Sequence, residues 1–103
     1  MNYWDHSDFL WAQNILRIHG LADWRLRIVE NIVAAPGFKQ NDATGHYSGY
    51  CRREEKVIEI LLDESRAEFH DTFLHELAHV WISGHNTDWQ LTYEALLRQY
   101  AKP

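Results

Sequence analysis

The sequence contains few of the residues that cross-link a chain or interrupt its helices and strands: one cysteine, two prolines and five glycines in 103 residues. A single cysteine excludes an intrachain disulfide, and such chains are typical of reducing compartments. No apolar run approaches the roughly 20 residues of a membrane-spanning helix. The N-terminus also lacks the positively charged and apolar regions of a secretory signal. These features predict a soluble, cytoplasmic protein with no membrane partner.

Positive charge is scarce as well. Ten lysines and arginines stand against fifteen aspartates and glutamates, which gives a formal net charge of −5. Nucleic-acid-binding domains typically carry a basic patch, so the charge does not support a nucleic-acid partner. The hydrophobic fraction of 46% and the five tryptophans argue against disorder. A chain of this length forms one domain, and we expect residues 1–103 to be that domain.

The five residues HELAH at positions 75–79 carry the strongest chemical signal. Two histidines four apart on a helix lie one turn apart on the same face, so His75 and His79 can reach one metal ion. Glu76 lies beside the pair and suits the role of general base toward a water molecule. This is the HExxH pattern of zinc hydrolases. The apolar flanks predict a buried helix, in which such a polar set is costly without partners.

A catalytic zinc site usually has three protein ligands and an open position. His85 follows a glycine that can end the helix, and a chain reversal there would return its ring to the metal. Asp88 and Glu94 are the alternatives, and Glu94 would make the site gluzincin-like. Imidazole suits zinc, so we favour His85 and expect one Zn²⁺ per chain. The spacing from His79 to His85 equals that of metzincins, but no methionine follows the site, which argues against that family.

Periodicity and turn residues predict an α+β fold. It comprises an N-terminal helix, a small and mainly antiparallel sheet of three strands, the metal helix packed on that sheet, and a C-terminal helix. Ser65 and Glu68 form a capping box before the metal helix, and residues 87–90 form a second one before the last helix. Cys51 is expected to be a small buried hydrophobe. In chain order the predicted elements span residues 7–19, 24–28, 45–52, 57–62, 66–82 and 87–100.

Other side chains are candidates for supporting roles. Thr72 and Glu68 fall on the metal side of the helix, about one and two turns before the histidines, and either could support the metal ligands from behind. Three residues of the neighbouring strand carry N–H or O–H groups that could stabilise an oxyanion or bind substrate. They are His46, Tyr47 and Tyr50.

Three segments resemble the SprT-like zinc metallopeptidases, particularly short stand-alone members found in phages and bacteria. They are HGLADWRLRI, YSGYCRREEKVIEILLD and FLHELAHVWISGHNTDW, and the resemblance covers most of the chain. It implies a zincin-like fold and peptidase activity. It also implies that Trp89 fills an aromatic position packing behind the third ligand. The zinc ligands it implies are His75, His79 and His85, with Glu76 as catalytic base.

The predicted function is therefore hydrolysis of a peptide bond in a protein or peptide substrate. Eukaryotic members of the resembled family cleave proteins crosslinked to DNA, but the acidic charge of this chain does not support that substrate. The alternative is a zinc-binding regulatory or interaction module without protease activity, which a closed site of four ligands would favour. A metal-dependent hydrolase acting on a different kind of bond is a third hypothesis.

Overall fold

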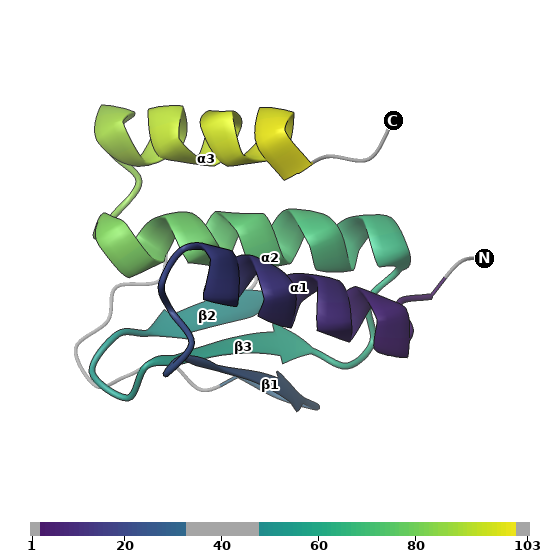
Figure 1. The fold of residues 1–103 in the computed structure, drawn as a ribbon. Coiled ribbons are helices and arrows are strands. Elements are labelled where there is room, and N and C mark those ends of the chain that lie inside the picture. Colours follow the sequence, from purple (N-terminus) through teal and green to yellow (C-terminus); the bar gives the residue numbers. More distant parts are fainter. Residues whose placement is uncertain (1–2, 33–47, 101–103) are drawn as a thin grey trace.

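The computed structural model describes residues 3–32 and 48–100, which form three helices and three strands. The sheet covers the lower part of Figure 1, α1 and α2 pack on one of its faces, and α3 packs against α2 on the side away from the sheet. The predicted α+β class is confirmed. None of the described helices is both long and apolar enough to cross a lipid bilayer. The elements are α1 (His6–Ile18), β1 (Arg25–Val29), β2 (Gly49–Arg52), β3 (Val57–Leu61), α2 (Arg66–Trp81) and α3 (Thr87–Tyr100).

The sheet is mixed, so the prediction of a mainly antiparallel sheet is wrong. Its strand order is β1-β3-β2, with β3 parallel to β1 and antiparallel to β2. The β2–β3 hairpin has a short connection, and such strands must run antiparallel. The direction of β1 has a different cause. Helix α1 leads into β1 and α2 follows β3, and each helix runs opposite to its adjoining strand (Figure 1). Because α1 and α2 run in the same direction, β1 and β3 do as well.

The two faces of the central strand have different surroundings. Ile58 and Ile60 are fully buried under the helices. Glu59 points to the other face, where Arg27 and Arg52 donate to its carboxylate at 3.1 and 2.9 Å. Burying a Leu, Ile or Phe side chain contributes about 1.5–3 kcal/mol, so the helical core residues account for much of the packing. Those residues are Ala12, Ile15, Leu16, Phe69, Phe73, Leu74, Leu77, Ala78, Trp89 and Leu96.

The starts of α2 and α3 test the two predicted capping boxes. At α2, Ser65 Oγ accepts from the Glu68 N–H at 3.1 Å and the Glu68 carboxylate accepts from the Ser65 N–H at 2.9 Å, as predicted. At α3 the cap is Asn86, whose Oδ1 accepts from the Trp89 N–H at 2.9 Å. The predicted box at 87–90 is therefore wrong. Asparagine is among the best N-cap residues, and here it caps the helix from the position before Thr87.

Candidate metal centre

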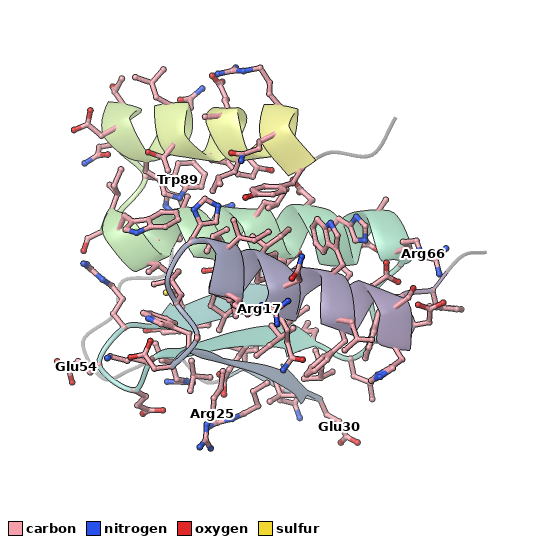
Figure 2. All side chains as sticks on the ribbon, in the orientation of Figure 1. Arg17, Arg25, Glu30, Glu54, Arg66 and Trp89 are labelled. Carbon is pink, nitrogen blue, oxygen red and sulfur yellow. The ribbon has the colours of Figure 1, made fainter. Side chains whose placement is uncertain are left out.

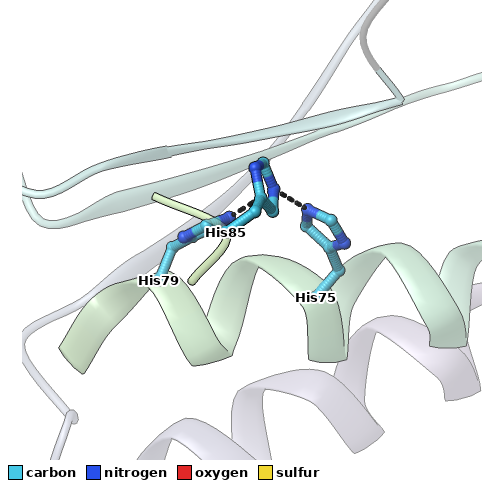
Figure 3. A group of neighbouring side chains, drawn as sticks. All are labelled: His75, His79 and His85. Carbon is cyan, nitrogen blue, oxygen red and sulfur yellow. Dashed lines mark hydrogen bonds between the residues drawn. The ribbon is translucent and has the colours of Figure 1, made fainter. Parts of the chain in front are cut away.

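Three histidine side chains converge beside the C-terminal half of α2 (Figure 3). His75 and His79 project from successive turns of α2, and His85 returns from the segment that joins α2 to α3. The Nε2 atom of His85 lies 3.1 Å from Nε2 of His79 and 3.2 Å from Nε2 of His75. Nitrogens bound to a tetrahedral zinc ion at about 2.0–2.1 Å are roughly 3.3 Å apart. The two distances to His85 are therefore close to the spacing that such an ion requires, and all three Nε2 atoms lie within 4.8 Å of one another.

A chain reversal after α2 brings the third histidine to the other two. Gly84 adopts a φ of 75°, a left-handed conformation that glycine tolerates without strain, and His85 follows it. Asp88 and Glu94 were the alternative ligands. Within the part of the chain that the structure describes, the group able to hold a metal contains only the three histidines.

The protonation of the imidazoles suits metal binding. His79 Nδ1–H donates to the carbonyl oxygen of Ile82 at 3.0 Å, which leaves the lone pair of its Nε2 directed at the other rings. Burial, with smaller contributions from His79 and His85, lowers the pKa of His75 to about 4. Burial also lowers the pKa of His79. Both rings are therefore neutral at pH 7, and neutral imidazole is the form that binds metals.

Glu76 lies next to His75 and only 7% of its surface is exposed. Its Oε2 is 3.9 Å from Nε2 of His75, the nitrogen that faces the other two rings. The backbone N–H of Cys51 donates to its carboxylate, and burial overcomes this hydrogen bond and raises the pKa of Glu76 to about 8. A carboxyl group with a pKa near neutrality in such a position is suited to proton transfer.

Aromatic rings form the wall behind the histidines. The Trp89 ring, between α2 and α3 in Figure 2, lies 4.6 Å from the rings of His75 and His85 and 5.2 Å from that of His79. Tyr93, one turn later on α3, stacks on Trp89 at 5.1 Å and lies 5.6 Å from His75. Trp89 thus packs against all three imidazoles. Sequence reasoning missed Tyr93, although its helical spacing from Trp89 was an available signal.

The two proposed supporting residues of α2 occupy different environments. Thr72 is buried and lies one turn before Glu76, where α2 contacts β2. Glu68 is exposed, and its carboxylate is engaged in the capping box at the start of α2. The structure therefore brings Thr72 close to Glu76 and leaves Glu68 at the far end of the helix.

The proposed oxyanion residues are not brought to the histidines in the described part of the structure. Successive residues of a strand point to opposite faces, and because Gly49 faces α2, Tyr50 points to the other face. There its ring lies 4.7 Å from the guanidinium carbon of Arg52. His46 and Tyr47 lie outside the described residues.

Cys51 contributes to the site through its backbone. Its side chain is half-buried and packs against the hydrophobic core, close to the environment expected for it. Burial raises the pKa of the Cys51 thiol to about 12, so the thiol is protonated at pH 7 and is a poor nucleophile. The backbone N–H, which reaches Glu76, was missed by sequence reasoning because backbone donors leave no signature in residue type.

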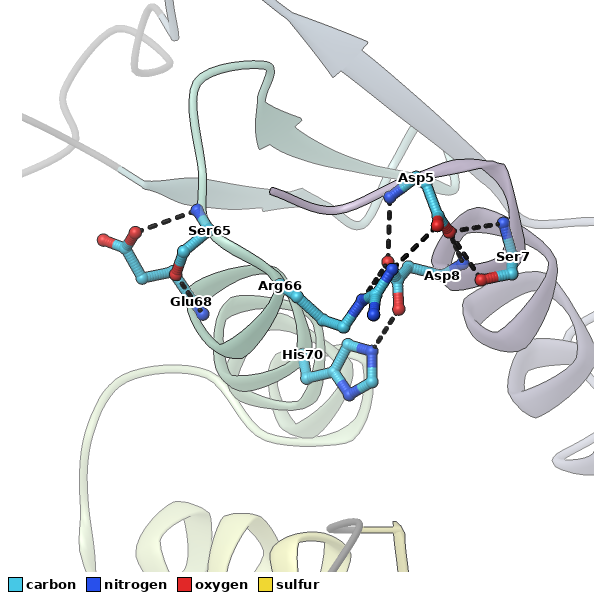
Figure 4. Close-up of polar contacts among 7 residues, drawn as sticks. All are labelled: Asp5, Ser7, Asp8, Ser65, Arg66, Glu68 and His70. Atoms are coloured by element: carbon cyan, nitrogen blue, oxygen red, sulfur yellow. Dashed lines mark hydrogen bonds and ion pairs between the residues drawn. The ribbon is translucent and has the colours of Figure 1, made fainter. Parts of the chain in front are cut away.

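A second histidine–carboxylate cluster joins α1 to the beginning of α2 (Figure 4). The buried carboxylate of Asp8 accepts hydrogen bonds from Nε2 of His70 at 2.7 Å, Nε of Arg66 at 3.0 Å and the Asp5 N–H at 2.8 Å. The His70 ring also stacks on Trp11, with centroids 4.0 Å apart. These contacts connect two helices, so we assign the cluster a structural role. His70 is not part of the metal centre.

No protein-family model, curated protein or solved structure matches this chain. The chemistry of the centre therefore has to be inferred from its own donors. Three imidazole nitrogens suit zinc, copper, iron or nickel, and a tetrahedral ion held by them would keep one position for water or substrate. A buried carboxylate beside that position is the arrangement that metal-assisted hydrolysis needs.

Proposed function

We propose that this protein is a zinc metallopeptidase of the zincin type, which hydrolyses a peptide bond in a protein or peptide substrate. The observation that carries the proposal is the buried Glu76 carboxylate, 3.9 Å from His75 Nε2, beside three converging imidazoles. The resemblance of three segments to SprT-like metallopeptidases supports a peptide as the substrate class. Zinc is the metal that the HExxH pattern favours.

His75, His79 and His85 would hold the zinc ion through their Nε2 atoms. The Nε2 atom of His85 lies 3.1 and 3.2 Å from those of His79 and His75, which fits binding to one shared metal ion. When bound, zinc supplies a Lewis acid that polarises the scissile carbonyl and lowers the pKa of water. The hydrogen bond from His79 to the Ile82 carbonyl and the contacts with Trp89 hold the rings in place. Such outer contacts typically affect metal affinity by 10- to 100-fold.

Glu76 would carry out the proton transfers. Its carboxylate accepts a proton from the attacking water as the water oxygen bonds to the scissile carbonyl carbon. It then passes that proton to the leaving nitrogen as the C–N bond breaks, which yields a carboxylate and a free amine. The Cys51 N–H restrains the carboxylate during both transfers.

A zinc-binding interaction module without peptidase activity is the second candidate. A structural zinc site is normally closed by four protein ligands. Over residues 3–32 and 48–100, no fourth histidine, cysteine or carboxylate joins the three histidines. In such a module, Glu76 would also have no function beside His75. Both points support the enzyme over the module.

Glu76→Gln is the variant that tests the proposal, because it keeps the shape of the side chain and removes its basicity. We expect zinc at one ion per chain by elemental mass spectrometry, as in the parent. Hydrolysis of fluorescein-labelled casein and of a mixed peptide library should fall by about 10²- to 10⁴-fold.

Glu94→Gln is the matched control, since it makes the same change on α3, where the Glu94 carboxylate accepts a hydrogen bond from the Gln90 side chain. We expect it to hydrolyse both substrates at the parent rate. Equal hydrolysis by parent and Glu76→Gln would contradict the general-base role. A zinc-loaded parent that cleaves neither substrate would favour the interaction module.

A further inference from the structure

Strand β2 lies close against helix α2 at Gly49. A methyl group at this position would lie 2.5 Å from Thr72 Cγ2 and 3.0 Å from Glu76 Cγ, well inside the roughly 3.5–4.0 Å of a normal carbon–carbon contact. The φ of Gly49 is not positive, unlike that of Gly20 and Gly84. Lack of space, and not backbone conformation, is therefore the reason that glycine is needed here.

The same strand presents a backbone donor two residues later. Ser48 O accepts from the Leu61 N–H at 3.0 Å, and backbone groups of an antiparallel strand alternate between facing the partner and facing away. Gly49 and Cys51 consequently direct their N–H and C=O groups away from β3. Within residues 3–32 and 48–100, β2 is at the edge of the sheet, and no described strand pairs with these groups. The Cys51 N–H bonds to the Glu76 carboxylate instead.

We propose that Gly49 is a positioning residue of the peptidase site. By allowing β2 to lie against α2, it places the Cys51 N–H where that group holds the Glu76 carboxylate beside His75. Among the described residues, this N–H is the one hydrogen-bond donor to the carboxylate. Catalytic groups lose rate when they move by as little as about 1 Å, so loss of this contact should reduce turnover. The kinetic part of this inference rests on the proposed function.

Gly49→Ala tests the inference. The new methyl group should push β2 away from α2, so we expect kcat on a casein-derived peptide to fall at least 10-fold. KM should change by less than about 3-fold, because ground-state binding of the substrate does not depend on the Glu76 carboxylate. Zinc content should stay at one ion per chain.

A second substitution should rescue the first. Thr72→Ser removes Cγ2, the atom nearest to the added methyl group, and keeps the hydroxyl. The double variant Gly49→Ala/Thr72→Ser should recover most of the lost kcat. Gly20→Ala is the matched control, because a methyl group there would meet nothing within 4 Å. Its positive φ makes the substitution destabilising, but kcat should not change.

Hydrogen exchange of the Cys51 amide gives a readout that needs no activity. We expect it to be at least 10-fold faster in Gly49→Ala than in the parent or Gly20→Ala, and to slow again in the double variant. If the parent cleaves no peptide, the proposed function fails, while this measurement still tests the placement of β2. Parent-like exchange and kcat in Gly49→Ala would overturn the inference.

Cys51→Pro provides a second route if Gly49→Ala does not fold. Proline is tolerated at the edge of a sheet where the N–H faces away from the partner strand, so this variant removes the proposed donor and keeps the β2–β3 ladder. We expect zinc to be retained and kcat to fall at least 10-fold. Parent-like kcat in zinc-loaded Cys51→Pro would mean that the donor does not position Glu76.

Discussion

Asp8 of α1 and Glu76 of α2 are both buried carboxylates. Their hydrogen-bond donors differ, and the difference distinguishes a structural carboxylate from a candidate catalytic one. Asp8 is 2% exposed and Glu76 is 7% exposed. Burial alone would raise the pKa of Asp8, but hydrogen bonds from the Asp5 N–H, His70 and Arg66 hold it below its usual value. Glu76 has the Cys51 N–H, and burial raises its pKa to about 8.

The difference lies in the number of donors and in their charge. Asp8 accepts from an arginine and a histidine, so its negative charge is stabilised at neutral pH and the group connects α1 to α2. Among the residues that the structure describes, the donor to Glu76 is the neutral Cys51 N–H, and a buried carboxylate without a charged donor is able to gain and lose a proton. A fully paired carboxylate stabilises a fold, whereas an incompletely paired one beside metal-ligating groups is a candidate for catalysis.

The largest effect should come from removing the third histidine. His85→Ala should reduce zinc affinity by at least about 100-fold, because two imidazoles cannot complete a three-ligand site. Elemental mass spectrometry on tag-free protein, after zinc is added back and the excess removed, would measure this. Asp88→Ala should retain the parent content. Zinc that survives in His85→Ala and is lost in Asp88→Ala would assign the third ligand to Asp88.

Removing the paired carboxylate should affect stability and not metal binding. Asp8→Ala leaves Arg66 and His70 without their common acceptor, so we expect the free energy of unfolding to fall by about 2 kcal/mol. Urea denaturation would measure it. Glu76→Gln should not lower the same quantity, since the amide oxygen still accepts from Cys51 and burial disfavours the charged carboxylate that the substitution removes. Equal losses in the two variants would remove the contrast between the carboxylates.

Glu64 is a third buried carboxylate, and 3% of its surface is exposed. Within the described part of the chain, its Oε1 has no hydrogen-bond partner. Burial is the main reason that the pKa of Glu64 rises from 4.5 to about 7, and the Thr72 hydrogen bond opposes the shift. Neighbouring negative charges on Glu68, Asp71 and Asp63 raise it further.

The raised pKa of Glu64 predicts a pH-dependent stability. The unfolded chain releases this proton near pH 4.5 and the folded chain near pH 7, so the contribution is present below pH 4.5 and is lost as the pH rises through 7. Glu64→Gln should therefore be more stable than the parent at pH 8, by on the order of 2 kcal/mol, and similar at pH 4. Urea denaturation at both pH values would measure this. A parent-like free energy of unfolding at pH 8 would contradict the raised pKa.

The smallest expected effect on the free energy of unfolding concerns Glu68, which we predicted from the sequence as a possible support for the metal ligands. Ser65→Ala should lower the free energy of unfolding by about 1 kcal/mol, as expected for an N-cap. Glu68→Ala should cost less, on the order of 0.5 kcal/mol, because the Ser65 hydroxyl still caps the helix. Zinc content should be unchanged in both. Loss of zinc in Glu68→Ala would show that its carboxylate supports the metal centre.

Features that depend on neighbouring residues were predictable from the sequence. The capping box of Ser65 and Glu68, the hairpin and the common face of His75 and His79 all follow from spacings of a few residues. The direction of β1 was not predictable, because it depends on how α1 and α2 share one face of the sheet. The capping residue of α3 was missed because Asn86 and the box at 87–90 are both good local signals, and the structure uses the earlier one.

By itself, the sequence determined the helix that carries the candidate centre, the two histidines on one face of it, and Glu76 between them, since helical geometry relates these residues directly. Only the tertiary structure decided which later residue joins them and what holds Glu76. The return of His85 and the approach of β2 at Gly49 are contacts between separate elements. Such contacts depend on which surfaces pack together and on the space between them, and neither is encoded in any short stretch of sequence.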